Sequence, residues 1–556
     1  MKVKTIRTLP GINIKEREKL IYIACMDSEK ECLTLIEKYI RISKFLGFYE
    51  VLVDFGHEDR EYHIWLTYTI EEAALKVLQS LLQGINEKYI IDDVKSILEK
   101  LWYRDILDFA EESGIPSIIL ENNSIQLGYG VNSTTLSEDK FLKEYKGNLS
   151  TLKKSITLNN NGNIPIISVT GTNGKTTTVR LIFKVLQKLG YKAGLASTGG
   201  IFIHERNIKN GDTTGFYSAR EVLKHPEVEA AVLETARGGI LKKGLGYKNS
   251  SAAVITSLSE DHIGMYGIND LYSLAKVKTT ILKALSPSGK IIILAIPILY
   301  DMVDSKENLC LFHIKKNEII KEHISSGGEA LYIEDNSLIY FIKGSFLNLG
   351  DIRTVEFTHK GISSGNIKNI MAAIGAVSAI HHNISDIFNA LKDIPCNLYS
   401  NPGRQNIFHL GKFKLILDYG HNSEAFKEVY SIAQGLNPEF ITGIIAAPGD
   451  RQDRYIIELG SISAEYCSKI FIREQVDLRG RVHGECAELI KRGVIEKGFP
   501  AHRLKVIFDE REALREAMES SVINEVIVLF TQCINEIIPV VNKYIEENTK
   551  ESIIII

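Results

Sequence analysis

The sequence has few cysteines, and they form no recognisable motif. Seven cysteines are scattered over 556 residues, and no two of them stand in a C-x-x-C spacing. An odd and scattered set argues against a disulfide framework and against a zinc knuckle. We therefore expect buried, reduced thiols and a protein of the cytoplasm.

The sequence also lacks an excess of either charge, and it lacks any long apolar run. Its 66 basic residues face 69 acidic ones, which gives a formal net charge of -3. This balance argues against a broad basic face, so we expect no nucleic-acid partner. The N-terminus has no apolar core of signal-peptide length, and the final Ile-Ile-Ile-Ile is too short to span a bilayer. We therefore expect no membrane partner.

The length and the pattern of apolar runs predict an α/β protein of three domains. At about 150 residues per domain, 556 residues suggest three or four domains. Residues 1–150 have a mixed α/β pattern, and a polar segment ending in LNNNGN separates them from the rest. Residues 160–396 alternate apolar runs with amphipathic segments, which predicts a doubly wound parallel sheet. Residues 397–545 repeat this rhythm, which predicts a Rossmann-like C-terminal domain.

A glycine-rich segment follows the first buried strand of the central domain. It has the sequence VTGTNGKTTT, with Lys175 and Thr176 at the entry of an amphipathic helix. The common P-loop has a glycine five places before Gly174, but that place is taken by Val169. Such a turn still points backbone N–H groups at an anion, so it predicts a phosphate site. A simple strand-to-helix turn with a chance Gly-Lys-Thr is the alternative.

Two later strands of the same predicted sheet end in candidate metal ligands. The run VEAAVLE ends at Glu234, and the run SAAVITS is followed by Asp261 and His262. Ligands of parallel sheets bind beyond the carboxyl ends of the strands, so these groups are expected beside the glycine-rich loop. Each alone is equally compatible with a solvated loop residue. Together with the loop they indicate a site for Mg²⁺ and a nucleotide.

These motifs resemble those of the Mur ligase family, whose members use ATP to join an amine to a carboxylate. The segments that carry the resemblance are VTGTNGKTTT, LETARGGIL and SEDH. Within the family the chain is most similar to the Mur-like half of the cyanophycin synthetases, through GDTTGFYSAREVL, LDYGHN, APGDRQD and VDLRGR. The resemblance covers roughly residues 165–540, and the shorter glycine spacing is the form that this family uses.

The resemblance implies roles for residues of the central domain. Thr176 and Glu234 are expected to bind one Mg²⁺, and His262 a second one together with a lysine that is often carbamylated in the family. That lysine is Lys278 in our interpretation and Lys276 in the alternative, although either could be an ordinary surface lysine. The residues expected to hold the ATP phosphates are Gly171, Thr172, Asn173, Gly174, Lys175, Thr176 and Thr177. Asn366 and Asn369 resemble the asparagines on the adenine side, or else they are helix caps.

The resemblance also implies roles for the C-terminal domain. Arg404 and Asp418 are expected to reach the phosphates and ribose of ATP, with the substrate residues His421 and Asn422 in the loop that follows. A second group lies at or near strand ends, where an arginine fork could hold the carboxylate of an incoming amino acid. Its members are Asp450, Arg451, Arg473 and Arg479. Solvated surface arginines are the alternative.

The implied activity is an amide ligase that activates a peptide-like acceptor as an acyl phosphate. Lys175, Glu234, His262 and Lys278 form the expected catalytic set, with ATP and two Mg²⁺ ions. The chain departs from the cyanophycin synthetases in three respects, one of which is VLFTQC at residues 528–533, where the resemblance leads us to expect acidic residues. The start of the chain resembles their N-terminal domain, but only about thirty residues separate Gly130 from Ile164, too few for their ATP-grasp domain. The run ILAIPILYDMV also replaces a usual Asn-Ala-Asp-Asp stretch.

Several questions stay open at this point. A cell-wall peptide ligase of the pseudomurein type is one alternative function, and a non-catalytic ATP-binding partner of a separate synthetase is another. The amino acid that is added, the acceptor, carbamylation of the lysine and the formation of a homo-oligomer are also left open.

Overall fold

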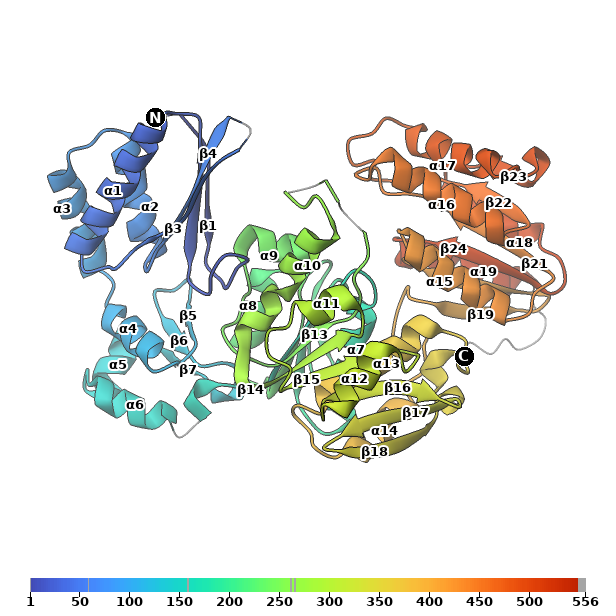
Figure 1. The fold of residues 1–556 in the computed structure, drawn as a ribbon, viewed down its shortest axis with the longest axis horizontal. Coiled ribbons are helices and arrows are strands. Elements are labelled where there is room, and N and C mark those ends of the chain that lie inside the picture. The colour runs from blue at the N-terminus through green and yellow to red at the C-terminus, as the bar shows by residue number, and fades with distance from the viewer. Residues whose placement is uncertain (1, 59, 158–159, 261–262, 265–266, 549–556) are drawn as a thin grey trace.

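The computed structural model describes residues 2–58, 60–157, 160–260, 263–264 and 267–548. In these residues the chain forms four β-sheets, and two of them lie within the region predicted as the N-terminal domain (Figure 1). The other two are the sheets of the predicted central and C-terminal domains. The predicted α/β class with large parallel sheets is confirmed.

The first sheet is antiparallel, with the strand order β1-β2-β4-β3. Three helices cover one of its faces, and their apolar sides share a core with the inward side chains of the strands. Ser28 and Glu31 form a capping box that fixes the start of the first helix. The elements are β1 (Val3–Leu9), β2 (Leu20–Cys25), α1 (Glu29–Phe45), β3 (Leu52–Glu58), β4 (Glu61–Thr67), α2 (Glu71–Leu82) and α3 (Glu87–Glu99).

A small second unit connects this sheet to the central domain. Its three short strands have the order β5-β6-β7 and a core of their own. The β5–β6 hairpin turns at Asn123, which adopts the left-handed φ of 54° that asparagine tolerates. The elements are α4 (Arg104–Glu112), β5 (Ser117–Ile119), β6 (Ile125–Leu127), β7 (Thr134–Leu136), α5 (Glu138–Tyr145) and α6 (Leu149–Thr157).

The central sheet has eleven strands in the order β11-β10-β9-β12-β8-β13-β14-β15-β16-β17-β18. In this order, the neighbouring strands from β9 through β12, β8, β13, β14 and β15 to β16 run parallel. At one edge β10 and β11 pair antiparallel, and at the other edge β17 and β18 do so. The strands are β8 (Ile166–Thr170), β9 (Ala193–Ser197), β10 (Gly200–Ile203), β11 (Arg206–Asn210), β12 (Ala230–Glu234), β13 (Ser250–Ile255), β14 (Leu285–Leu294), β15 (Leu309–Phe312), β16 (Glu329–Glu334), β17 (Ser337–Ile342) and β18 (Ser345–Asp351).

Helices cover both faces of this sheet, as the predicted doubly wound arrangement requires. Helices α7 and α13 pack against each other on one face, and α8 to α12 contribute to the core of the other. The helices are α7 (Lys175–Lys188), α8 (Phe216–Lys224), α9 (Arg237–Lys243), α10 (Leu271–Thr279), α11 (Pro297–Asp301), α12 (Glu318–Ser325), α13 (Ser364–Val377) and α14 (Ile384–Lys392). Because β8 lies between β12 and β13, the carboxyl ends of these three parallel strands meet at one edge.

The C-terminal sheet has six strands in the order β19-β20-β24-β21-β22-β23, and only its edge strand β19 is antiparallel. Figure 1 shows this domain and the N-terminal domain on opposite sides of the central domain. The elements are β19 (Asn406–Leu410), β20 (Phe413–Asp418), α15 (Ser423–Gly435), β21 (Phe440–Ile445), α16 (Asp453–Tyr466), β22 (Lys469–Ile472), α17 (Glu485–Glu496), β23 (Leu504–Val506), α18 (Glu510–Glu519), β24 (Glu525–Phe530) and α19 (Ile534–Asn548).

Two general expectations can be compared with the described residues. All seven cysteines are free thiols, six of them buried and Cys533 partly buried, as predicted. Within the described ranges, no helix combines the length and the apolarity needed to cross a membrane.

Candidate active site

The glycine-rich loop joins β8 to α7 and is bound to the segment that follows β13. The backbone N–H of Thr172 donates to the Ser257 carbonyl at 3.0 Å, and that of Asn173 donates to Ser257 Oγ at 2.8 Å. The Asn173 carbonyl accepts from Thr256 Oγ1 at 2.6 Å. These bonds fix the loop from one side, so its other side is held toward a cavity.

Two glycines are required by close approaches in this loop. Gly174 has φ of +84°, and a Cβ on it would lie 2.4 Å from Asn369 Oδ1. A Cβ on Gly171 would lie 2.0 Å from Thr256 Oγ1. Gly174 precedes the first turn of α7, whose backbone N–H groups have no partner within the helix and favour an anion. The loop therefore has the geometry of a phosphate site with only these two glycines.

Lys175 lies across this loop. Its Nζ donates to the Thr172 carbonyl at 2.9 Å, which holds the ammonium group over the loop rather than in bulk solvent. Lys175 and Thr176 both border two adjoining cavities of the active site, one of about 470 Å³ and one of about 320 Å³. A positive charge in this position can bind the terminal phosphates of a nucleotide.

The smaller cavity contains oxygen ligands suited to Mg²⁺. Glu234, at the end of β12, is 3% exposed and accepts from Thr176 Oγ1 at 2.9 Å. It also accepts from Thr198, through Oγ1 at 3.0 Å and through the backbone N–H at 2.9 Å. The hydroxyl and carboxylate fit a magnesium ion that binds few protein groups and takes its remaining ligands from phosphates and water.

Thr198 was not predicted from the sequence, although the same rule could have found it. It follows β9, which is the parallel strand next to β12, so it lies at the same sheet edge as Glu234. Asp212 and Arg237, from the motifs GDTTGF and ETARGG, also border the smaller cavity. For Thr198 the available signal was a strand next to β12 in the sheet. For Asp212 and Arg237 it was their position in segments that carry the family resemblance.

The structure separates the two candidate lysines of α10. Lys278 is 3% exposed and borders the smaller cavity together with Glu234. Lys276 is exposed, and its ammonium group lies 4.8 Å from the centre of the Tyr272 ring. The geometry therefore favours Lys278 as the lysine of the site.

The second predicted metal ligand is not placed by the structure. His262 and the neighbouring Asp261 lie outside the described residues. Elsewhere in the described chain, no three His, Cys, Asp or Glu side chains come together in a way that could hold a metal ion. A metal ion at Glu234 thus depends on ligands from the nucleotide.

The two asparagines of α13 have different positions. Asn369 borders the larger cavity and accepts from Thr178 Oγ1 at 3.2 Å. Asn366 lies behind it, where its Oδ1 accepts from Asn369 Nδ2 at 3.2 Å and its Nδ2 donates to the Phe357 carbonyl at 2.9 Å. Asn366 can therefore orient Asn369, but it does not border the cavity.

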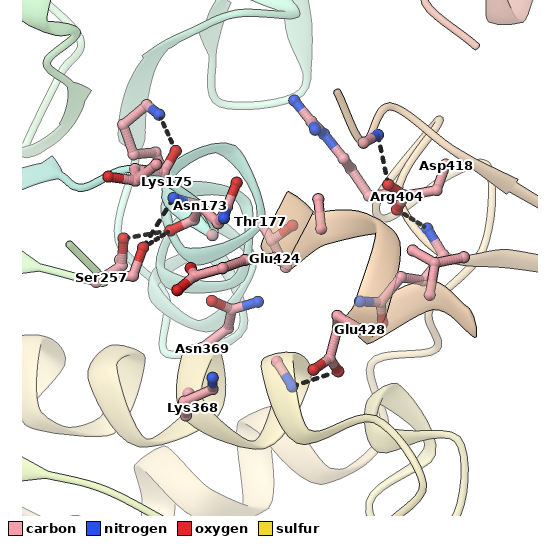
Figure 2. A pocket seen from close by; sticks show the side chains of 18 of the residues that line it. Asn173, Lys175, Thr177, Ser257, Lys368, Asn369, Arg404, Asp418, Glu424 and Glu428 are labelled. Carbon is pink, nitrogen blue, oxygen red and sulfur yellow. Dashed lines mark hydrogen bonds between the residues drawn. The ribbon is translucent and has the colours of Figure 1, made fainter. Parts of the chain in front are cut away.

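The larger cavity lies between the central and C-terminal domains. Figure 2 shows Asn173 and Lys175 on one side of it and Arg404 and Asp418 on the other. Between them lies α15, whose Glu424 faces Asn369 of α13, while its Glu428 lies at the start of that helix and accepts from the backbone N–H of Gly365. Arg404, Glu424, Glu428 and Lys368 all border this cavity. A nucleotide bound by the glycine-rich loop would therefore be enclosed by both domains.

Asp418 is held rigidly at the end of β20. Its carboxylate accepts from the backbone N–H of Gln405 at 2.9 Å and from that of Gly420 at 2.6 Å. Burial raises the pKa of Asp418 above its ordinary value, whereas the positive charge of Arg404 acts in the opposite direction. Arg404 itself packs over the Tyr419 ring, 4.2 Å from its centre. Asp418 and Arg404 thus border the same cavity, and their contact with the phosphates and ribose of ATP stays a prediction.

His421 and Asn422 follow Asp418 in the same loop. His421 borders both cavities, and its Nδ1 lies 3.2 Å from the Tyr419 carbonyl oxygen. Asn422 contacts the glycine-rich loop, because its Nδ2 donates to Asn173 Oδ1 at 3.0 Å. In this structure Asn422 joins two domains rather than bordering the larger or the smaller cavity.

Three of the four predicted amino-acid-binding residues form one cluster. Asp450 accepts from Arg451 Nη1 at 2.9 Å and from Arg479 Nη1 at 3.1 Å. Both arginines border the smaller cavity, which also contains Glu234 and Lys278. Asp450 therefore positions two guanidinium groups at the cavity that contains the candidate metal ligands.

Arg473 does not belong to this cluster. It is buried inside the C-terminal domain, where its Nη2 lies 3.0 Å from Glu510 Oε1 and donates to the Phe530 carbonyl at 2.6 Å. Its position at the end of β22 led to the predicted substrate role. The structure corrects that prediction, because the charge of Arg473 is already compensated by Glu510 at the start of α18.

Comparison with known proteins agrees with this geometry. Residues 169–377 match the family model of the Mur ligase middle domain. This segment is a Mur ligase middle domain. The resemblance inferred from the sequence motifs is therefore confirmed, and the domain includes the glycine-rich loop, Glu234 and Lys278.

The relatives extend beyond this domain. A cyanophycin synthetase from Synechocystis is 34% identical over 382 residues, which are 68% of this chain and 43% of that protein. The chain thus spans less than half the length of this relative. A UDP-N-acetylmuramyl-tripeptide synthetase from Borreliella afzelii is 24% identical over 446 residues, 76% of this chain and 82% of that one.

A solved structure shares the fold of this chain. It is a bifunctional folylpolyglutamate synthase/dihydrofolate synthase from Yersinia pestis, in complex with AMPPNP and a manganese ion. Its sequence is 17% identical, with a TM-score of 0.50 over 68% of this chain and 89% of that chain.

Proposed function

We propose that the protein is an ATP-dependent ligase that joins the amine of an amino acid to a carboxylate of a peptide-like acceptor. One observation carries the proposal. The phosphate loop, the Thr176–Glu234 pair and Lys278 face Arg451 and Arg479 of the C-terminal domain across one cavity. The synthetase names of the relatives support the same class of reaction.

The proposed first step is phosphoryl transfer to the acceptor. A carboxylate is a poor electrophile, so one of its oxygens attacks the γ-phosphorus of ATP, and the bond between that phosphorus and the β,γ-bridging oxygen breaks to release ADP. Lys175 and the N-terminus of α7 stabilise the negative charge of the transferring group. Thr176 and Glu234 would hold Mg²⁺, which would supply further positive charge at the phosphates. The product is an acyl phosphate on the acceptor.

The proposed second step forms the amide bond. The nitrogen of the amino acid attacks the acyl carbon and loses a proton, and the carbon–oxygen bond breaks to release phosphate. Arg451 and Arg479, both ordered by Asp450, can bind the carboxylate of the incoming amino acid through their planar forks. Binding in this position directs the amine toward the acyl carbon of the acceptor, in the cavity that Glu234 and Lys278 border.

Contacts between the domains protect the reactive acyl phosphate from water. Besides the pair Asn173 and Asn422, Glu428 of α15 accepts from the backbone N–H of Gly365 at 2.7 Å. A carboxylate at the first turn of α13 is favourable for that helix. These contacts join the two domains beside the larger cavity.

One observation favours a second candidate, a non-catalytic nucleotide-binding partner of a separate synthetase. Leu294 and Ile296 border the larger cavity, in the stretch where the resemblance leads one to expect polar and acidic residues. Apolar groups there leave fewer ligands for a second metal ion.

Phosphate release distinguishes the two functions. The assay combines Mg-ATP with each of the twenty amino acids and with a set of peptide carboxylates as acceptors. The ligase predicts release that requires both an amine and an acceptor. ATP binding without release in any pairing would favour the non-catalytic function. The Lys175→Ala variant serves as the background, because it removes the positive charge that would bind the phosphates and leaves the rest of the site in place.

A further inference from the structure

A third cavity of about 460 Å³ lies away from the active site, where the N-terminal units meet the central domain. Its walls come from the segment between β1 and β2, the loop between β4 and α2, the small second unit, and the central segments around Arg220 and Lys248. No residue of this wall borders either cavity of the active site. Cavities between domains are common places for small ligands.

The wall of this cavity is held by backbone contacts between domains. Ile12 forms an isolated antiparallel bridge with Leu245, whose N–H donates to the Ile12 carbonyl at 2.8 Å. A Cβ on Gly11 would lie 2.0 Å from the Leu245 carbonyl oxygen, so the two backbones touch. Lys283 Nζ also donates to the Ile14 carbonyl at 3.0 Å. The cavity is therefore part of a rigid interface.

Two positive side chains on this wall form no ion pair with any described carboxylate. Arg220 makes no hydrogen bond or ion pair with any described residue, and its buried Nε has no partner. Its guanidinium lies 4.3 Å from the centre of the Phe216 ring. Lys19 donates to the Thr69 carbonyl at 3.1 Å and has no carboxylate within ion-pair distance among the described residues. Burial lowers the pKa of both side chains, whereas the charge of Glu71 acts in the opposite direction on Arg220, as do those of Glu111 and Glu18 on Lys19.

The acidic residues of this cavity lie at its exposed rim. Glu18, Glu71 and Glu72 are all exposed, and Glu71 accepts from Thr8 Oγ1 at 2.7 Å. Exposed Glu111 pairs with Lys248, so that pair is neutral. The inner wall therefore carries two positive charges that form no ion pair with the acidic residues of the rim. A buried charge without a counter-charge is costly, and an anion bound between Lys19 and Arg220 would relieve that cost.

We propose that this cavity is a second ligand site, which binds a carboxylate between Arg220 and Lys19. The unpartnered Nε and the neighbouring amino group of Arg220 form a fork that matches a carboxylate. The acidic rim disfavours a phosphate or a polyanion and favours a ligand with a positive group outside its carboxylate. The chemical class is a zwitterionic amino acid or short peptide. The site is independent of the proposed ligase reaction, since it shares no wall residue with the active site.

Calorimetric titration without nucleotide tests the proposal on the full-length protein. The probe is the dipeptide Ala-Arg, compared with Ala-Arg amide and with inorganic phosphate. We expect the free carboxylate to bind and the amide to bind about tenfold more weakly, since a charge-assisted hydrogen bond is lost. Arg220→Gln and Lys19→Gln should each weaken Ala-Arg by about the same factor. Because the two substitutions are made in separate proteins, one variant still tests the proposal if the other proves unstable.

Matched controls locate the binding. Lys224→Gln changes another cation of α8 that pairs with Glu221 and does not border the cavity, so it should leave the affinity unchanged. Arg479→Gln changes the active site and should also leave it unchanged. Absence of heat with the wild-type protein, wild-type affinity in both Arg220→Gln and Lys19→Gln, loss of binding in Arg479→Gln, or equal affinity for phosphate would each overturn the proposal.

Discussion

Asn173 of the glycine-rich loop and Asn422 of the C-terminal domain exchange two hydrogen bonds between their side-chain amides. Asn173 Nδ2 donates to Asn422 Oδ1 at 3.2 Å, and Asn422 Nδ2 donates to Asn173 Oδ1 at 3.0 Å. The same Asn422 oxygen accepts from the backbone N–H of Ala425 and so caps α15. One side chain thus connects the phosphate loop to the helix that covers the nucleotide cavity.

The first prediction separates these two roles of Asn422. Serine caps a helix well but is too short to reach Asn173, whereas alanine loses both functions. We expect Asn422→Ser to raise the apparent KM for ATP about fivefold, because an intramolecular hydrogen bond contributes about 1 kcal/mol. Its stability should stay close to that of the wild type. Asn422→Ala should show the same rise in KM and in addition lose about 1 kcal/mol of stability. Wild-type KM in Asn422→Ser would show that the contact between the domains is unimportant.

The second prediction concerns the carboxylate at the end of β12. Glu234→Gln removes the charge that binds the metal, and we expect phosphate release to fall about a hundredfold, with a higher Mg²⁺ concentration for half-saturation. Thr198→Ala removes only the hydroxyl that donates to Glu234, while the backbone N–H remains. It should cost about tenfold at most. A Mg²⁺ titration of both variants checks this order, and the reverse order would exclude Glu234 as the metal ligand.

Much of the proposed metal site follows from the sequence alone, because it depends on strand ends. An apolar run that ends in a glutamate places Glu234 at the edge of a parallel sheet, and the adjacent glycine-rich loop has its own local signature. The same rule misassigned Arg473, which also ends a strand. Its partner Glu510 comes from a helix whose packing no local pattern reveals.

Contacts between distant segments account for the remaining differences. Asn422 was expected to touch substrate, but it binds the phosphate loop, because the closed arrangement of two domains brings them together. The cavity around Lys19 and Arg220 was not predicted either. Its two charges come from different domains. Lys19 stands in no motif, and Arg220 stands in GDTTGFYSAREVL, where nothing in the sequence indicates that it borders a cavity. Burial without a partner is a property of the assembled chain and leaves no signal in the sequence.

The third prediction distinguishes the two lysines of α10. Lys278→Gln should reduce phosphate release at least about a hundredfold, since a buried lysine next to Glu234 is lost from the site. Lys276→Gln is the matched control, because it makes the same change two residues away on an exposed side chain. It should retain wild-type turnover. Fixed-time assays of phosphate release with saturating Mg-ATP measure the turnover of both variants. Equal turnover would remove Lys278 from the proposed catalytic set.

The last prediction concerns pH and the boundary between the central domain and the linker to the C-terminal domain. Burial lowers the pKa of His359 to about 4, and a hydrogen bond to the Gln405 backbone acts weakly in the opposite direction. His359 is therefore neutral in the folded protein at a pH where the unfolded chain, with the ordinary value of 6.5, already binds a proton. Because the unfolded state binds more protons, stability must fall as the pH is lowered from about 6.5 to about 4.

This fall is expected to reach about 3 kcal/mol from His359 alone. A titration of unfolding by urea at several pH values measures it. His359→Asn removes the titrating group and keeps a residue that tolerates the left-handed φ of 52° found at this position. His409 is the control, since burial lowers its pKa as well but it lies on β19, away from this boundary. The loss of stability between pH 6.5 and pH 4 should be smaller in His359→Asn than in His409→Asn. If the free energy of unfolding depends on pH in His359→Asn as it does in the wild type, His359 is accessible to water in the native state. The boundary would then be less tightly packed than the structure indicates.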